Sequence, residues 1–181
     1  MLRGALFLNG DLGIRILRHV LTIPEIRLDI LVLNNQPKRS IGILQQIGKI
    51  VAELPYQIEI VDWSSESQQT IFNIAKNCQF GISVLFGHKI PLELIHAFKF
   101  GIINLHPSLL PLGKGADPVA WGILLKQDQG ASIHLVTKNI DHGEILSQEK
   151  IETNLSMNAG EIYDICTESL YKQFTEILFH G

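Results

Sequence analysis

The sequence contains little cysteine, no long apolar run and no excess of positive charge. Cys78 and Cys166 are the two cysteines among 181 residues, and they lack the CxxC spacing of zinc or redox sites. We therefore expect a reducing compartment, without a disulfide framework or structural zinc. No run approaches the ~18 apolar residues of a membrane span, and the apolar stretch 5–8 is too short for a signal-peptide core. These absences predict a cytoplasmic protein with no membrane partner.

The charge balance argues against a nucleic-acid partner. The formal net charge is -3, whereas a protein that binds the phosphate backbone needs a clustered positive surface. Hydrophobic residues make up 46% of the chain and charged residues 18%, which is typical of a globular protein. Because the sequence shows no linker, repeat or low-complexity segment, we expect one catalytic domain over residues 1–181.

The first 106 residues alternate between strand and helix patterns. Strands are predicted at 4–8, 27–35, 57–61, 80–86 and 101–106, and helices at 12–23, 41–54, 67–78 and 91–98. Such alternation is typical of an α/β protein with an open, mostly parallel, Rossmann-like sheet and helices on both faces.

The pattern changes after residue 106. A helix is predicted at 117–126, and two strands at 131–141 and 144–152 are predicted to form a late antiparallel pair through the turn Asp141-His142-Gly143. A C-terminal amphipathic helix follows at 158–179, with Asn158 and Glu161 as a capping box. Its predicted buried face consists of Ile162, Ile165, Cys166, Leu170, Phe174 and Ile177.

Polar side chains stand at the end of the strand 101–106. Side chains alternate along a strand, so Asn104 and His106 point to the same side, and Pro107 keeps His106 extended. Ligands of open parallel sheets bind beyond the carboxyl ends of the strands. The carboxylate of Asp141 would meet His106 if the late strand lies beside this one. Each residue also has a structural interpretation, as a turn former or a half-buried histidine.

The segment "NLHPSLLP", followed by a glycine-rich loop and later by "IDHGEIL", resembles the folate-dependent formyltransferases. The resemblance is strong from Gly81 to Ile151. It implies transfer of a formyl group from 10-formyltetrahydrofolate to a primary amine, without a metal, and it places Asn104, His106 and Asp141 on the family's catalytic residues. His106 would act either as a base toward the amine or as a charged stabiliser of the oxyanion; both roles stay open.

The resemblance also implies where the folate donor binds. In the family, backbone groups after the central strand and in the loop before the catalytic aspartate hold the pterin. The matching residues are His88, Lys89 and Ile90, and Val136, Thr137, Lys138, Asn139 and Ile140. Recognition through the backbone leaves the identity of these side chains loosely constrained.

Two loops bear on the amine acceptor. The loop "LGKGADPVAW" resembles the nucleotide-sugar branch, and Lys114 in it could reach an anionic acceptor. Gly10 lies in the first turn, "LNGDLG", where Asp11 would repel the ribose phosphate of glycinamide ribonucleotide. We expect an amino sugar carried on a nucleotide, with glycinamide ribonucleotide as the alternative and a homodimer as the assembly to test. A methionyl-tRNA acceptor is disfavoured by the negative charge and the short chain.

Two other classes of function remain as alternatives. His106, His134, Asp141 and His142 could bind a metal in a hydrolase, but they lack HxH or HExxH spacing. A non-catalytic Rossmann-like binding module would fit a chain in which Asn104, His106 and Asp141 do not converge.

Overall fold

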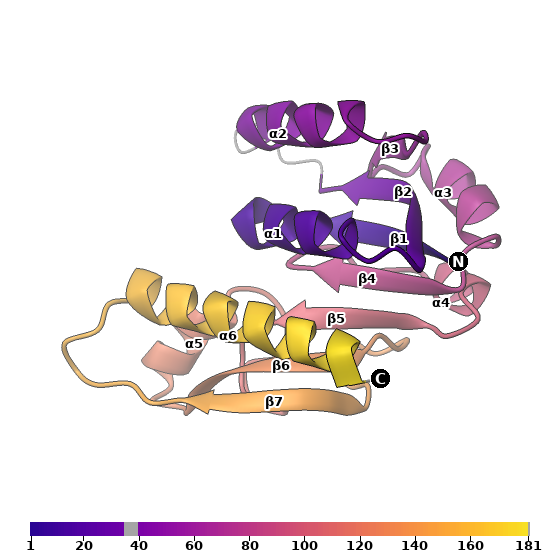
Figure 1. Ribbon diagram of the computed structural model, residues 1–181. Helices are drawn as coiled ribbons and strands as arrows, with labels where there is room; N and C mark the ends of the chain where they lie inside the picture. Colours follow the sequence, from indigo (N-terminus) through magenta and orange to yellow (C-terminus); the bar gives the residue numbers. More distant parts are fainter. Residues whose placement is uncertain (35–39, 181) are drawn as a thin grey trace. The chain divides into compact units, whose positions relative to one another are not determined.

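The structure is a computed structural model that describes residues 1–34 and 40–180 (Figure 1). Asn35, which was expected to close the second strand, lies outside the described residues. The chain forms two compact units, Met1–Ile102 and Ile103–Gly181.

The first unit is a parallel, doubly covered sheet. Its strands are β1 (Leu2–Leu8), β2 (Ile26–Leu33), β3 (Glu59–Asp62) and β4 (Phe80–Val84), in the order β3-β2-β1-β4. Its helices are α1 (Gly10–Val20), α2 (Ser40–Ala52), α3 (Gln68–Ala75) and α4 (Leu92–Ala97).

The strand order explains the two helical layers of this unit. The chain moves from β1 outward to β3 and then crosses back to β4, on the other side of β1. With right-handed crossovers, α1 and α2 cover one face and α3 covers the other. Accordingly, α1 contacts α2, and α3 contacts α4. Residues 5–8 of β1 and 28–33 of β2 are therefore buried without a break, as expected for strands covered on both faces.

The second unit has antiparallel strands. β5 (Ile102–His106) pairs with β6 (Gln129–Leu135), which pairs with β7 (Ile145–Ile151). The short helix α5 (Pro118–Leu124) and the long helix α6 (Ala159–His180) contact each other and β6, and α6 also contacts β7. The predicted fold class is confirmed: an α/β protein with a mostly parallel sheet, a late antiparallel pair and a C-terminal helix.

The connection between β6 and β7 differs from the sequence prediction. The strand expected to reach residue 141 ends at Leu135, and residues 136–144 form a loop instead of a three-residue turn. The physical reason lies in two backbone positions. Asp141 has a φ of 53°, which is incompatible with a strand. A Cβ on Gly143 would lie 1.7 Å from the carbonyl oxygen of Leu135, so the chains approach too closely for a side chain there.

Helix α6 begins with the predicted capping box. The carboxylate of Glu161 accepts a hydrogen bond from the Asn158 N–H, and the Asn158 side-chain oxygen accepts from the N–H of Gly160 and of Glu161. The predicted buried face is right at four positions, namely Ile162, Cys166, Leu170 and Phe174.

The prediction is wrong at Ile165, which is 38% exposed. The buried stripe instead runs through Ser169 and Gln173, where the side-chain N–H of Gln173 donates to the Ser169 hydroxyl at 2.9 Å and this hydroxyl donates to the Glu149 carboxylate. The side-chain oxygen of Gln173 is buried without a hydrogen-bond partner among the described residues. Ile177 is half-buried.

Among the described residues, no helix combines the length and apolar character needed to cross a membrane. The cytoplasmic location expected from the sequence stays a prediction.

We predict that α6 is held mainly by its fully buried aromatic anchor. Phe174→Ala should lower the free energy of unfolding by about 3–5 kcal/mol, because it leaves a cavity in the core. The matched change Ile165→Ala, on the exposed side of the same helix, should cost less than about 1 kcal/mol. Denaturant unfolding measures both values, and equal losses would contradict this assignment of the buried face.

Candidate active site

The pairing of β5 with β6 creates a polar face at the predicted site. Asn104 lies opposite His134, and His106 lies opposite Ser132. Directly opposed residues of an antiparallel pair point to the same side of the sheet. One face therefore carries four polar side chains, although sequence reasoning had considered His134 only as a metal ligand. The available signal was the polar pair Ser132 and His134, two positions apart in an apolar strand.

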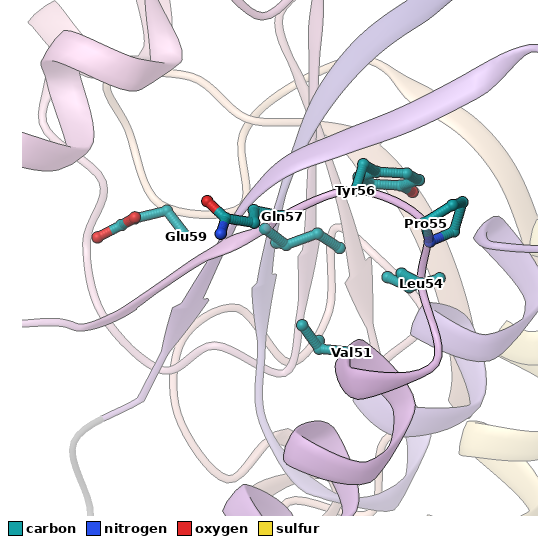
Figure 2. A pocket seen from close by; sticks show the side chains of 7 residues that line it. Val51, Leu54, Pro55, Tyr56, Gln57 and Glu59 are labelled. Carbon is teal, nitrogen blue, oxygen red and sulfur yellow. The ribbon is translucent and has the colours of Figure 1, made fainter.

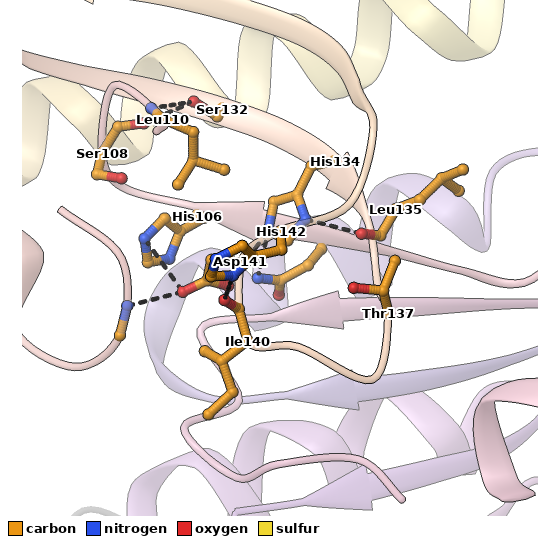
Figure 3. Close-up of polar contacts among 12 residues, drawn as sticks. His106, Ser108, Leu110, Ser132, His134, Leu135, Thr137, Ile140, Asp141 and His142 are labelled. Carbon is orange, nitrogen blue, oxygen red and sulfur yellow. Dashed lines mark hydrogen bonds and ion pairs between the residues drawn. The ribbon is translucent and has the colours of Figure 1, made fainter. Parts of the chain in front are cut away.

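The carboxylate of Asp141 lies at the centre of this face (Figure 3). Its Oδ2 accepts a hydrogen bond from the Gly115 N–H at 2.8 Å and lies 3.6 Å from Nε2 of His106. Its Oδ1 lies 3.4 Å from Nε2 of His134. The three side chains are almost fully buried, with exposed fractions of 8% for His106, 9% for Asp141 and 2% for His134. The structure thus brings Asp141 and His106 together.

Hydrogen bonds to main-chain carbonyls fix which nitrogen of each ring carries a proton. Nε2 of His106 lies 2.9 Å from the Gly113 carbonyl oxygen, which can only accept, so Nε2 carries the hydrogen and Nδ1 is bare in the neutral ring. In His134, Nδ1 donates to the Leu135 carbonyl oxygen at 2.9 Å. Nε2 of the neutral His134 ring is then free to accept from the Asn104 side-chain amide, 3.2 Å away.

The environment lowers the pKa of both His106 and Asp141. Burial is the main cause for His106, because it disfavours the imidazolium, and the charge of Asp141 opposes it. For Asp141, burial acts to raise the pKa, but the hydrogen bond that a protonated His134 donates, the charge of a protonated His106 and the Gly115 N–H outweigh it. The pair therefore favours an ionised carboxylate beside an imidazole that is mostly neutral at pH 7.

A second polar row supports the loop after β5. The hydroxyl of Ser132 donates to the Ser108 carbonyl oxygen and accepts from the Leu110 N–H, at 2.6 and 3.2 Å. Gln148, opposite Ser132 on β7, donates to the Leu110 carbonyl oxygen at 2.7 Å and to the Ser132 hydroxyl at 2.9 Å. Figure 3 shows Ser132 beside Leu110. Ser132 and Gln148 were not predicted from the sequence, because their contacts with the loop after β5 depend on strand register.

The residues predicted to contact the donor and the acceptor lie on exposed segments. His88 and Lys89 are exposed and Ile90 is buried, whereas Val136 is half-buried and residues 137–140 are exposed. Lys114 is exposed, and Gly10 opens α1 with a φ of 67°. Their binding roles stay predictions.

A cavity elsewhere in the first unit is unrelated to these predictions. It is lined by Val51 near the end of α2 and by residues 54–59, which connect α2 to the start of β3 (Figure 2). Since none of these residues carries a predicted role, the cavity does not compete with the polar face of β5 and β6. No group of three or more His, Cys, Asp or Glu side chains among the described residues could hold a metal ion.

The fold and this polar face define an α/β protein equipped for proton transfer and for stabilising negative charge. The sequence matches the family of formyl transferases over residues 33–178, so the chain belongs to that family. It is 39% identical over 90 residues to a methionyl-tRNA formyltransferase from Clostridium perfringens, a match covering 49% of this chain and 29% of that protein. The chain thus spans less than a third of the matched relative.

Solved structures of formyltransferases share the fold. A sugar N-formyltransferase from Shewanella sp FDAARGOS_354 superimposes with a TM-score of 0.81 at 17% identity, over 98% of this chain and 68% of that chain. The formyltransferase PseJ from Anoxybacillus kamchatkensis, solved with UDP-4,6-dideoxy-4-formamido-L-AltNAc and tetrahydrofolate, is 28% identical. Its TM-score is 0.58 over 81% of this chain and 72% of that chain. The predicted family is confirmed.

We predict that Asp141 controls the protonation of His106. The pKa of His106 should lie below 6.5, and Asp141→Asn should lower it further, because the carboxylate favours the imidazolium. A lowered pKa also means that this histidine reduces the free energy of unfolding as the pH falls below 6.5, where the unfolded chain takes up the proton first.

NMR titration of the imidazole signals in both proteins tests this prediction. The exposed His96 on α4 serves as the internal control, because the substitution should leave its imidazole signals unchanged. A His106 pKa that rises in Asp141→Asn would contradict the geometry.

Proposed function

We propose that the protein is an enzyme that transfers a formyl group from 10-formyltetrahydrofolate to a primary amine, with residues 1–181 as its formyltransferase catalytic domain. The observation that carries the proposal is the convergence of Asn104, His106 and Asp141 in a member of the formyl transferase family. Donor binding is assigned, also as a proposal, to main-chain groups of residues 88–90 and 136–140.

The proposed reaction is an acyl transfer in which a negative charge develops on the carbonyl oxygen and a proton moves from the amine to the folate. The nitrogen of the amine attacks the formyl carbon, and the carbonyl oxygen becomes an oxyanion. The bond between the carbon and N10 of the folate then breaks, the amine loses a proton and N10 gains one. Asn104 donates an amide N–H to the oxyanion, which is the interaction that strengthens as charge develops.

We assign His106 the role of base. Its lowered pKa keeps the ring neutral near pH 7, so one ring nitrogen can take the proton of the attacking amine. Asp141, 3.6 Å away, stabilises the imidazolium that results. The same imidazolium can then return the proton to N10, which balances the reaction without a metal.

For the acceptor, we propose an amino sugar carried on a nucleotide. Two observations support this choice: the likeness to PseJ, solved with a UDP-linked sugar, and the loop "GKGADP" at 113–118, which resembles the nucleotide-sugar branch. Lys114 is exposed in this loop and could bind an anionic diphosphate.

Methionyl-tRNA is the second candidate acceptor. The specific observation in its favour is the 39% identity to a methionyl-tRNA formyltransferase. This identity is higher than the 28% to PseJ, but it covers 49% of the chain, whereas the match to PseJ covers 81%. The formal net charge of -3 speaks against it, because tRNA binding gains most of its affinity from cationic side chains. Glycinamide ribonucleotide receives less support, because Asp11 stands in the first turn.

We predict formylation of a nucleotide-linked amino sugar. Incubation with 10-formyltetrahydrofolate and, in parallel, amino-sugar nucleotides, glycinamide ribonucleotide and methionyl-tRNA should yield a formamido product with the first group, detected by mass spectrometry. Turnover with methionyl-tRNA alone would replace the proposed acceptor by the second candidate. No formyl transfer to any of the three would overturn the proposed function.

We predict that the side-chain amide of Asn104 is needed for the transition state. Asn104→Ala should reduce kcat by about 10²–10³, because it removes an oxyanion donor. The matched control Asn73→Ala changes an exposed asparagine on α3 and should keep kcat near the wild-type value. A loss below tenfold in Asn104→Ala, with the acceptor saturating, would remove Asn104 from the mechanism.

A further inference from the structure

The side chain of His88 makes contacts that its expected role does not require. Main-chain recognition of a donor by residues 88–90 would require no contact from this side chain. His88 is exposed, yet its imidazole is bonded to Asn34 and stacked on Trp63, with the ring of Phe86 beside it. All four residues belong to the first unit and lie just after the carboxyl ends of β2, β3 and β4 or in the loop that follows.

The hydrogen bond connects the loop after β4 to a fixed point. Nε2 of His88 donates to the side-chain oxygen of Asn34 at 2.7 Å, because an amide oxygen can only accept. Asn34 is 7% exposed, and its own N–H is directed to the Leu8 carbonyl oxygen, 3.4 Å away. The acceptor is therefore anchored between the ends of β1 and β2.

The aromatic contacts orient the ring of His88. It stacks on Trp63 with ring centroids 6.0 Å apart and an interplanar angle of 24°, and it meets Phe86 edge-on at 5.3 Å. Trp63 is a rigid support, because it is 8% exposed, its ring packs edge-on against Phe7, and its main-chain N–H donates to the Leu33 carbonyl oxygen at 2.9 Å. The imidazole is thus oriented both by its hydrogen bond to Asn34 and by its ring contacts with Trp63 and Phe86.

The loop that carries His88 needs such a restraint. Leu85 has a φ of 51° and Gly87 a φ of 75°, and a left-handed conformation is unfavourable for leucine. A Cβ placed on Gly87 would lie 3.2 Å from the side-chain nitrogen of Asn34, so Asn34 leaves little room for a side chain at the residue before His88. The contacts of Asn34 therefore stabilise a conformation that the chain would not favour on its own.

We propose that His88 is a positioning residue whose side chain, clasped by Asn34 and Trp63, holds the loop 85–90 in the conformation that presents its main-chain groups to the folate donor. This inference rests on the proposed function. It assigns the side chain of His88 a role in donor affinity and none in the transfer step.

Three substitutions at His88 separate the two kinds of contact. His88→Ala removes both, His88→Phe keeps an aromatic ring on Trp63 without a donor, and His88→Gln keeps a donor without the ring. Asn34→Ala and the double variant with His88→Ala complete a double-mutant cycle. His96→Ala is the control, because His96 is an exposed histidine on α4, just after the same loop.

Two measurements test the proposal. With the donor varied at saturating acceptor, His88→Ala should raise the KM for 10-formyltetrahydrofolate by about three- to tenfold, the equivalent of one lost hydrogen bond, and should leave kcat unchanged. His88→Phe and His88→Gln should each recover part of this loss. Hydrogen–deuterium exchange of residues 85–90 should accelerate in His88→Ala and Asn34→Ala, and the double variant should add nothing further.

The results that would overturn the inference differ from those that would overturn the proposed function. The contacts of His88 with Asn34 and Trp63 would be excluded as a restraint on the loop if His88→Ala changed neither the KM nor the exchange. Fully additive effects in the double variant would exclude the coupling between His88 and Asn34. A fall in kcat at constant KM would exclude a positioning role in donor binding. Absence of formyl transfer by the wild-type protein would overturn the proposed function. The exchange measurement would then still show whether the side chains of His88 and Asn34 restrain residues 85–90.

Discussion

The candidate site depends on keeping one carboxylate ionised while it is almost buried. Removing a carboxylate from water is costly unless hydrogen bonds and opposite charges replace the solvent. Asp141 obtains these partners from three separate segments: the Gly115 N–H in the loop after β5, His106 at the end of β5 and His134 on β6. The pairing of β5 with β6 places His106 and His134 side by side, and the Asp141 carboxylate contacts both of them and the Gly115 N–H.

The two histidines around Asp141 differ in what they can do. His134 has one nitrogen bonded to the Leu135 carbonyl oxygen and the other between Asn104 and Asp141. Both ring nitrogens therefore have partners within the protein. His106 bonds the Gly113 carbonyl oxygen through Nε2 and keeps an unprotonated nitrogen in the neutral ring. A proton acceptor near neutral pH must have such a free nitrogen. This asymmetry supports His106 as the base and His134 as the residue that orients the amide and the carboxylate.

The sequence carried enough information to predict the fold class and part of the site. Strand alternation places Asn104 and His106 on one side whatever the tertiary structure, and the order of strands and helices predicts the parallel sheet. The meeting of His106 with Asp141 required a further condition, the pairing of β5 with β6, which the sequence could suggest but not prove. His134, Ser132 and Gln148 depend on the register of that pairing, and no local pattern encodes a register.

In two places the local sequence pattern predicts a structure that the chain does not form. Residues 136–140 alternate like a strand, but the left-handed Asp141 and the close approach of Gly143 to Leu135 end the strand early. At Ile165, hydrophobicity predicted burial, whereas Ser169 and Gln173 occupy the buried stripe, where Gln173 donates to Ser169 and Ser169 donates to Glu149. In both places, tertiary contacts outweighed residue type.

In the proposed reaction, the buried cluster can serve any primary amine, because it handles only a carbonyl oxygen and a proton. Asn104, His106 and Asp141 need no information about the rest of the acceptor. Discrimination among amines must therefore come from groups outside the cluster that touch the acceptor at a distance from the reacting nitrogen. The loop around Lys114 is the proposed source of such a contact, because Lys114 is exposed while Gly113 and Gly115 beside it are bonded to His106 and Asp141. Under the proposed function, a change in this loop would alter the choice of acceptor while Asp141 and its partners stay the same.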